Sequence, residues 1–280
     1  MSPELLYGLI LLAAVAHATW NALIKSAADR LLMMAAIRLV GLLFGLAVLP
    51  FVSWPGETAA IWLGLAAIAN FAYHALLIQS YRVGDLSLVY PLARGSAPVL
   101  LALTAFVVID ERLEPTQIAA VLLITGGILA LVIGKGGDRT AVCFALATGI
   151  SIAGYSFFGG LGVRSSASVL GFQAWLEIVT GIGVLAFAAI RRRGQVHAFA
   201  RTSGSLGLLA GALSVGGYLV FLAAAKVLPL APVAALRECS LIFGTIIGAV
   251  VLREGFGARR IAAAVLVMAG VIVLGAGALH

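Results

Sequence analysis

Ten long apolar runs make up most of the sequence, and they restrict the possible folds more than any other feature. A helix needs about 20 apolar residues to cross the hydrocarbon core of a bilayer. The runs lack the period-two alternation of barrel strands, so helices are the spanning structure that they can form. We predict an all-α integral membrane protein with ten transmembrane helices, near residues 5–24, 32–52, 58–80, 84–109, 115–134, 140–162, 168–190, 205–225, 229–252 and 258–278.

The scarcity of charged residues supports the same class. Hydrophobic residues make up 62% of the 280 positions and charged residues 10%, whereas a soluble domain carries about 25% charged residues. The connections between the runs are too short to hold a soluble catalytic module. The N-terminal stretch has no basic segment and no small-residue cleavage motif, so we expect it to be the first span rather than a signal peptide.

The basic residues predict topology rather than a nucleic-acid partner. The net charge is +7, but the basic residues are scattered or gathered in short loops and form no stripe. Cytoplasmic loops carry an excess of Lys and Arg. We therefore expect a multi-pass protein of the cell (inner) membrane with external termini, surrounded by the lipid bilayer. Twelve basic residues follow odd-numbered spans (Lys25, Arg30, Arg82, Lys135, Arg139, Arg191, Arg192, Arg193, Arg201, Arg253, Arg259 and Arg260), and three lie on the other face (Arg112, Arg164 and Lys226).

The two halves of the chain repeat one another. Features of the fourth and fifth spans recur 143 positions later: Arg94 as Arg237, Glu111 as Glu254, Gln117 at the place of Arg260, and residues 118–120 as 261–263. In the earlier spans the offset is near 135, which places Asn21 opposite Ser156. Five spans are an odd number, so the second copy must be inserted upside down. We predict a 5+5 inverted repeat, residues 1–137 and 138–280, with the substrate site near the midplane.

The fourth span contains residues that hydrocarbon tolerates poorly. Proline removes a backbone donor, and an arginine at the bilayer centre costs about 2.5 kcal/mol or more. Such a segment belongs beside a polar cavity. Pro91, Gly95 and Pro98 predict an interrupted helix that acts as a hinge, and the ninth span has no proline opposite Pro98, so we expect the two repeats to bend unequally.

Charged and polar side chains inside the spans are the candidate substrate site. Arg94 and Arg237 occupy equivalent positions and, with Arg38, would hold an anionic group such as a carboxylate or phosphonate. Two alternatives stay open: Arg38 and Glu177 could pair only for assembly, and the two histidines could be packing residues. The remaining candidates are Trp20, Asn21, Tyr90, Tyr155, His17 and His74.

Glu177 and Glu238 are candidates for proton coupling. Burial opposes ionisation of a carboxyl and a nearby arginine favours it, so the balance allows protonation during a transport cycle. No acidic cluster resembles a sodium site, and facilitated diffusion is equally open.

Motifs for catalysis, metals and cofactors are absent from the sequence. The nearest approach is Gly154–Phe157, but phenylalanine stands where an intramembrane serine protease would have glycine after its serine. There is no H-E-x-x-H and no phosphate-binding loop. Cys143 and Cys239 lie in apolar runs and predict neither a disulfide nor a zinc site. We therefore expect no enzyme activity and no cofactor.

The sequence resembles the EamA branch of the drug/metabolite transporter superfamily. The resemblance rests on LLAAVAHATWNALIKSAADRLLMMAAIRLVGLL with Trp20, Lys25 and Arg38, on Asp110–Leu113, Gln117 and Gly127, and on Leu252–Glu254, Arg260 and Gly270 in the second half. It implies a ten-helix inverted-repeat carrier or exporter of amino acids, metabolites, nucleotide derivatives or drugs. Asn21 and Ala120 stand where the family has glycine, and Leu241 where it has proline. Relatives generally have cytoplasmic termini, which conflicts with the charge bias.

Two functions fit these observations. The first is a secondary transporter, exporter or carrier, that moves a small polar or anionic metabolite by alternating access. The alternative is a membrane protein with a sensing or assembly role and no transport. A transporter needs a hydrated cavity between the repeats, whereas an assembly protein would have a closed interior. A homodimer is compatible with either.

Overall fold

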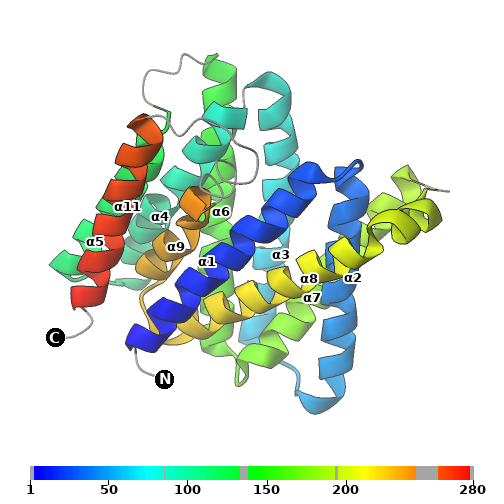
Figure 1. Cartoon of the computed structure of the whole chain (residues 1–280). Helices are drawn as coiled ribbons and strands as arrows, with labels where there is room; N and C mark the ends of the chain where they lie inside the picture. The colour runs from blue at the N-terminus through cyan, green and yellow to red at the C-terminus, as the bar shows by residue number, and fades with distance from the viewer. Residues whose placement is uncertain (1–2, 85, 133–137, 193–194, 244–257, 278–280) are drawn as a thin grey trace.

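The computed structural model describes residues 3–84, 86–132, 138–192, 195–243 and 258–277. These residues form helices joined by short connections, and no β-strand occurs among them (Figure 1). The all-α class is confirmed. The α-helices are α1 (Pro3–Ser26), α2 (Arg30–Val48), α3 (Glu57–Val83), α4 (Leu86–Ile109), α5 (Pro115–Ala130), α6 (Arg139–Ser165), α7 (Val169–Arg191), α8 (Val196–Val227), α9 (Leu230–Glu238) and α11 (Ala258–Gly277), and a 3-10 helix, η1 (Leu49–Phe51), follows α2.

Seven of the described helices are long and apolar enough to cross a membrane: α1, α2, α3, α4, α6, α7 and α8. Helix α5 and residues 261–277 of α11 are apolar but shorter. The predicted ninth span, 229–252, is described only as far as residue 243, and its remainder lies outside the described residues, as does the predicted repeat boundary at 137. The described chain is therefore a multi-pass helical membrane protein with seven candidate spans.

The break in the helices lies in a different span from the one that the prolines predicted. Helix α4 runs through Pro91 and Pro98 without interruption. Helix α9, which begins the ninth span, instead ends at Glu238. Cys239 is a single turn residue, whose N–H bonds to the oxygen of Leu236, only three residues earlier, at 3.1 Å, and helical structure resumes at residues 240–243. An interruption within a spanning helix is a common feature of transporter folds.

Gly95 has a packing role in α4. A Cβ at this position would lie 2.9 Å from Cδ2 of Leu129 on α5, closer than real Cβ atoms come, so the missing side chain lets α4 and α5 approach. Movement at Pro91, Gly95 and Pro98 during a cycle stays a prediction.

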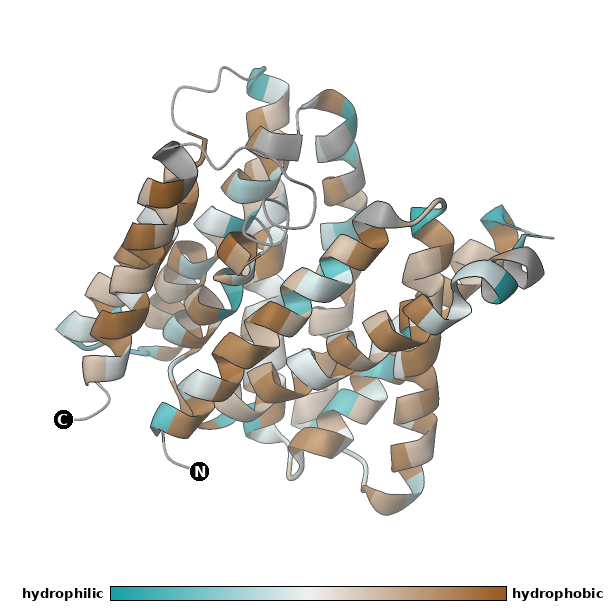
Figure 2. Cartoon of the chain, in the orientation of Figure 1, coloured by the Kyte–Doolittle hydropathy of each residue, from teal (hydrophilic) through white to brown (hydrophobic). Residues whose placement is uncertain are grey.

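Helices from the two halves of the chain pack against one another. Helix α3 lies against α6, α1 against α8, α2 against α7 and α5 against α11, and α4 packs on α6, α5 and α9. Apolar residues make up most of the length of these helices (Figure 2). Large apolar side chains, such as Leu12, Ile61 and Val107, are exposed on them. Lipid tails can cover such a surface, because it presents almost no polar groups.

Asp29 fixes the start of α2 beyond the membrane-spanning segments. Its carboxylate accepts the N–H groups of Leu31 and Leu32 and pairs with Arg192 at 2.7 Å. Burial raises the pKa of this carboxyl, but the hydrogen bonds and the guanidinium outweigh burial and hold the pKa below its usual value.

Two neighbouring glycines of α5 test the packing of the bundle. A Cβ at Gly127 would lie 2.9 Å from the backbone oxygen of Ala263 on α11, whereas a Cβ at Gly126 would meet nothing within 4 Å. We expect Gly127→Ala to destabilise the protein by about 1–3 kcal/mol through overpacking. Gly126→Ala is the control and should be neutral or slightly stabilising. Thermal unfolding in detergent measures both changes, and equal midpoints for the two variants would contradict the assigned contact.

Candidate functional site

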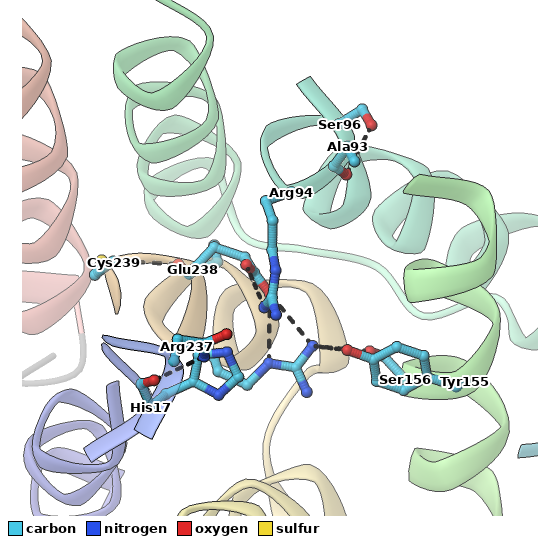
Figure 3. Close-up of polar contacts among 11 residues, drawn as sticks. His17, Ala93, Arg94, Ser96, Tyr155, Ser156, Arg237, Glu238 and Cys239 are labelled. Carbon is cyan, nitrogen blue, oxygen red and sulfur yellow. Dashed lines mark hydrogen bonds and ion pairs between the residues drawn. The ribbon is translucent and has the colours of Figure 1, made fainter. Parts of the chain in front are cut away.

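Three charged side chains meet where α4 crosses the end of α9 (Figure 3). Arg94 lies in the middle of α4, and Arg237 and Glu238 are the last two residues of α9. Arg94 Nη1 donates to Glu238 Oε2 at 3.0 Å and to Oε1 at 3.3 Å. Arg237 donates to Oε1 from Nη2 at 3.3 Å and from Nε at 3.4 Å. All three residues are at most 6% exposed, so two guanidinium groups share one buried carboxylate. We call this set the arginine cluster.

Hydroxyls and aromatic rings surround Arg237. Its Nη2 donates to Ser156 Oγ at 3.1 Å and to Tyr155 Oη at 3.4 Å, both on α6. The guanidinium carbon lies 4.3 Å from the ring centre of Phe221 on α8 and 5.5 Å from that of Tyr155. Cation–π contacts of this kind contribute about 2 kcal/mol when desolvated. Tyr155 is one of the residues that the sequence predicts at the site, whereas Ser156 and Phe221 are not. Ser156 had two signals, its position opposite Asn21 and its place in Gly154–Phe157, and neither predicted a contact with Arg237.

Tyrosines continue this lining around Arg94. The guanidinium carbon of Arg94 lies 5.5 Å from the ring centre of Tyr90, one turn earlier on α4. Tyr73 on α3 contacts Tyr155 edge to face, with ring centres 5.8 Å apart. The structure thus places Tyr90 and Tyr155 beside the arginines, with Tyr73 next to Tyr155. Tyrosine suits this place because its ring packs while its hydroxyl remains able to bond.

The end of α9 favours the buried charge of Arg237. The carbonyl end of a helix carries a partial negative charge, equivalent to about half an elementary charge. Arg237 lies in the last turn of α9, where that partial charge favours a cation. The break at Cys239 therefore supplies part of the compensation that a buried arginine needs.

Arg38 and Glu177 form a second ion pair. Arg38 Nη1 on α2 lies 3.3 Å from Glu177 Oε2 on α7, with side-chain exposures of 17% and 6%. A Cβ at Gly41 would overlap the Glu177 carboxylate, so the glycine makes room for the pair. The two helices come from different halves of the chain, and the pairing leaves both predicted roles, assembly and transport, open.

The remaining predicted residues lie on α1 and α3. His17 contacts Trp20 edge to face at 4.7 Å, and Asn21 Nδ2 donates to the His17 backbone oxygen at 2.7 Å. His17 Nε2 is buried without a hydrogen-bond partner in the structure, so it can still accept or donate one bond. His74 Nδ1 bonds to the backbone oxygen of Asn70 at 2.7 Å. Within the described residues these side chains make no hydrogen bond to the arginine cluster.

The comparisons with known proteins assign part of the chain to a family. Residues 139–276 match the model of the EamA-like transporter family. These residues are an EamA-like transporter domain. The family resemblance seen in the sequence is thereby confirmed, and family membership implies a membrane transporter with a small-molecule substrate. EamA proteins are typically transporters without enzymatic activity.

Similarity to solved structures extends beyond the EamA domain. A crystal structure titled "Crystal structure of protein" shares 19% identity and a TM-score of 0.75 over 99% of this chain and 97% of its own. It is one of 29 solved chains that match. At this identity the likeness shows the fold alone. No curated protein matches the sequence.

The arginine cluster lies across the boundary of the EamA domain. Arg237, Glu238 and Tyr155 belong to residues 139–276, whereas Arg94 and Tyr90 precede them. Within the described residues, no group of three His, Cys, Asp or Glu side chains could hold a metal ion. The cluster presents guanidinium N–H donors, a type of group that binds anions in proteins, and among its described residues no nucleophile is paired with a base.

A separate groove opens between α1, α9 and α11. Its volume is about 190 Å³, and it is mostly apolar. One of its lining residues, Leu236, directly precedes Arg237 in the sequence, but none of the predicted site residues lines the groove. Its lining is Glu4, Tyr7, Gly8, Leu11, Leu236, Val271, Leu274 and Gly275.

Proposed function

We propose that the chain is a secondary transporter that moves small organic anions by alternating access, with the arginine cluster as its substrate site. The observation that carries this proposal is one buried carboxylate shared between two arginines. The EamA domain supports transport in general. The charge of the cluster supports the choice of anions.

Among the residues that the structure describes, the charges at the site do not balance. Arg94 and Arg237 contribute two positive charges and Glu238 one negative charge, which leaves +1, while Arg38 and Glu177 neutralise each other. An unbalanced charge among buried side chains is costly. A substrate carboxylate or phosphonate would neutralise it and would gain charge-assisted hydrogen bonds from the guanidinium groups.

Glu238 has a defined part in this proposal. Its carboxylate occupies the place between the two guanidinium groups that a substrate anion would take. Substrate therefore competes with Glu238 for the arginines, and protonation of Glu238 would free both of them. Proton coupling through Glu238 or Glu177 follows as part of the proposal. Trp20, Asn21, His17 and His74 shape the site from α1 and α3.

The packing of the helices supports the proposed 5+5 inverted repeat. Under that symmetry α1 corresponds to α6, α3 to α8, α2 to α7 and α5 to α11. The two-fold axis that relates the repeats then converts the contact of α1 with α8 into the contact of α6 with α3. The contacts of α2 with α7 and of α5 with α11 each join a helix to its own symmetry equivalent, so they lie on that axis. Ten spans, external termini and a homodimer remain predictions.

Uptake by the purified protein tests the function. Liposomes containing the protein are loaded with an unlabelled monocarboxylate, phosphonate, zwitterion or organic cation, and counterflow of the labelled compound is measured with and without an imposed pH gradient. We expect counterflow of at least one anion, none of the cation, and a response to the gradient if Glu238 takes up a proton. Counterflow of the cation alone would contradict the anionic site, and no counterflow of any compound would favour a sensing or assembly role.

A further inference from the structure

A second polar network joins four helix ends on the face where α4–α5, α6–α7 and α8–α9 connect, at the lower end of Figure 1. Arg164, at the end of α6, pairs with Glu111 after α4, with 2.7 Å between Nη1 and Oε2. Arg164 also donates from Nε to the Ala225 oxygen and from Nη2 to the Leu228 oxygen, each at 2.8 Å. The second Glu111 oxygen, Oε1, accepts the N–H of Leu230 at 2.7 Å. We call this network the Glu111 clamp.

The clamp satisfies groups that helix ends leave without partners. Arg164 donates hydrogen bonds to two carbonyl oxygens at the end of α8, and Glu111 accepts one from the first N–H of α9. Glu111 lies outside the EamA domain, whereas Arg164 and Leu230 lie inside it. The clamp therefore ties the first part of the chain to the EamA domain at one face of the membrane.

Helix α9 connects the clamp to the arginine cluster. It has nine residues, all buried, with Leu230 at its start and Arg237 and Glu238 at its end. A helix of nine residues is about 13 Å long and moves as a rigid unit. A shift of α9 that opens a path to the arginines must therefore change the bond between Glu111 and Leu230.

The clamp differs from the arginine cluster in exposure. Side chains of Arg164 and Glu111 are 27% and 12% exposed, whereas those of Arg94 and Glu238 are 3% and 1% exposed. Water can replace hydrogen bonds at a partly exposed pair, so breaking it costs far less than breaking a buried one. Alternating access requires two conformations whose free energies differ by only a few kcal/mol, and a pair that is easily broken meets this requirement.

We propose that the Glu111 clamp is the closed gate at this face, and that Glu111 is a positioning residue that sets the place of α9 and, through it, of Arg237 and Glu238. The proposal rests on the transport function proposed above. Release of the Glu111–Arg164 pair frees α9 at its start and opens the arginine cluster to this face. The pair re-forms when the carrier opens to the other side of the membrane.

The native Cys239 is a reporter for this opening. It follows Glu238 and is 2% exposed. With Cys143→Ser as background, Cys239 is the one remaining thiol of the chain. A membrane-impermeant maleimide is added to intact cells and, separately, to inside-out vesicles, and the labelling rate is measured for each side. No substrate is needed, so the gate can be tested even if the transport proposal fails.

Glu111→Ala removes both the ion pair and the acceptor for Leu230. We expect it to raise the Cys239 labelling rate about tenfold or more from one side only, which corresponds to the loss of hydrogen bonds to a charged group. Glu111→Gln keeps an acceptor oxygen but loses the charge, so its rate should be intermediate. Asp110→Asn is the matched control, because its exposed pair with Arg112 lies in the same turn.

Transport kinetics separate positioning from simple stability. Because Glu111→Ala leaves every side chain of the arginine cluster in the protein and changes how α9 moves, the maximal rate should fall several-fold while KM stays within about twofold of the wild-type value. Labelling at the wild-type rate would overturn the proposal, and so would equal acceleration from both sides, which indicates general loosening. Where Glu111→Ala fails to fold, the same criteria apply to Glu111→Gln.

Discussion

Replacing Glu238 with Gln is expected to lower the free energy of unfolding by about 3–5 kcal/mol, because it leaves two buried guanidinium groups without a counter-charge. Glu238 is 1% exposed and accepts hydrogen bonds from both Arg94 and Arg237. Glutamine has nearly the same shape, so the substitution isolates the effect of charge. Unfolding of the purified protein in detergent, by heating and by titration with a denaturing detergent, measures the change.

An exposed ion pair elsewhere in the chain supplies the control. Asp110 lies 3.1 Å from Arg112, but the two side chains are 68% and 77% exposed, and exposed pairs contribute about 0–1 kcal/mol. Asp110→Asn should therefore leave the unfolding midpoint almost unchanged. Adding Arg94→Gln to Glu238→Gln removes one of the unpaired charges and should recover part of the loss. If Glu238→Gln and Asp110→Asn have the same unfolding midpoint in detergent, the Glu238 carboxylate does not stabilise the two buried arginines in the purified protein.

Hydropathy was sufficient to predict the helices but not where they break. Apolar runs longer than 18 residues have few alternatives to a spanning helix, so all-α structure followed from composition and length. The break at Cys239 has no proline or glycine to mark it, since the residues around it are Glu238 and Ser240. Conversely, Pro98 lies within a continuous α4, where neighbouring helices can take over the freed carbonyl.

Repeat symmetry predicted the two arginines but not the carboxylate between them. At the spacing of 143 residues Arg94 pairs with Arg237, whereas Glu238 falls opposite Gly95 and has no counterpart. A residue outside the repeat pattern gives no indication of its partner until the helices are packed. The Glu111 clamp was missed for the same reason, because the repeat pairs Glu111 with Glu254, which lies outside the described residues, and not with Arg164.

Transport of small organic anions is expected to fall by about 10- to 100-fold when Arg94 or Arg237 is replaced with Gln. Each replacement removes charge-assisted hydrogen bonds, which contribute about 1.5–3 kcal/mol each, and a tenfold change corresponds to about 1.4 kcal/mol. Initial counterflow rates in liposomes, normalised to the amount of folded protein, measure the effect. Arg112→Gln is the control, since the Arg112 side chain is 77% exposed and pairs with Asp110 rather than with Glu238.

A double variant separates the charge of the site from the identity of its arginines. Arg94→Gln alone leaves Arg237 and Glu238, which neutralise each other, so the site has no charge with which to attract an anion. Adding Glu238→Gln leaves Arg237 alone and restores a charge of +1. We expect the double variant to transport the anion faster than Arg94→Gln, although more slowly than the wild type, because one guanidinium offers fewer hydrogen bonds than two.

The order of the three rates decides the mechanism. Competition between substrate and Glu238 for the arginines requires the wild type to be fastest, the double variant intermediate and Arg94→Gln slowest. If the double variant is instead slower than Arg94→Gln, Glu238 contributes more than competition, as a proton carrier would, and the response of the double variant to an imposed pH gradient should disappear. If both variants transport the anion at the wild-type rate, the arginine cluster is not part of the transport path.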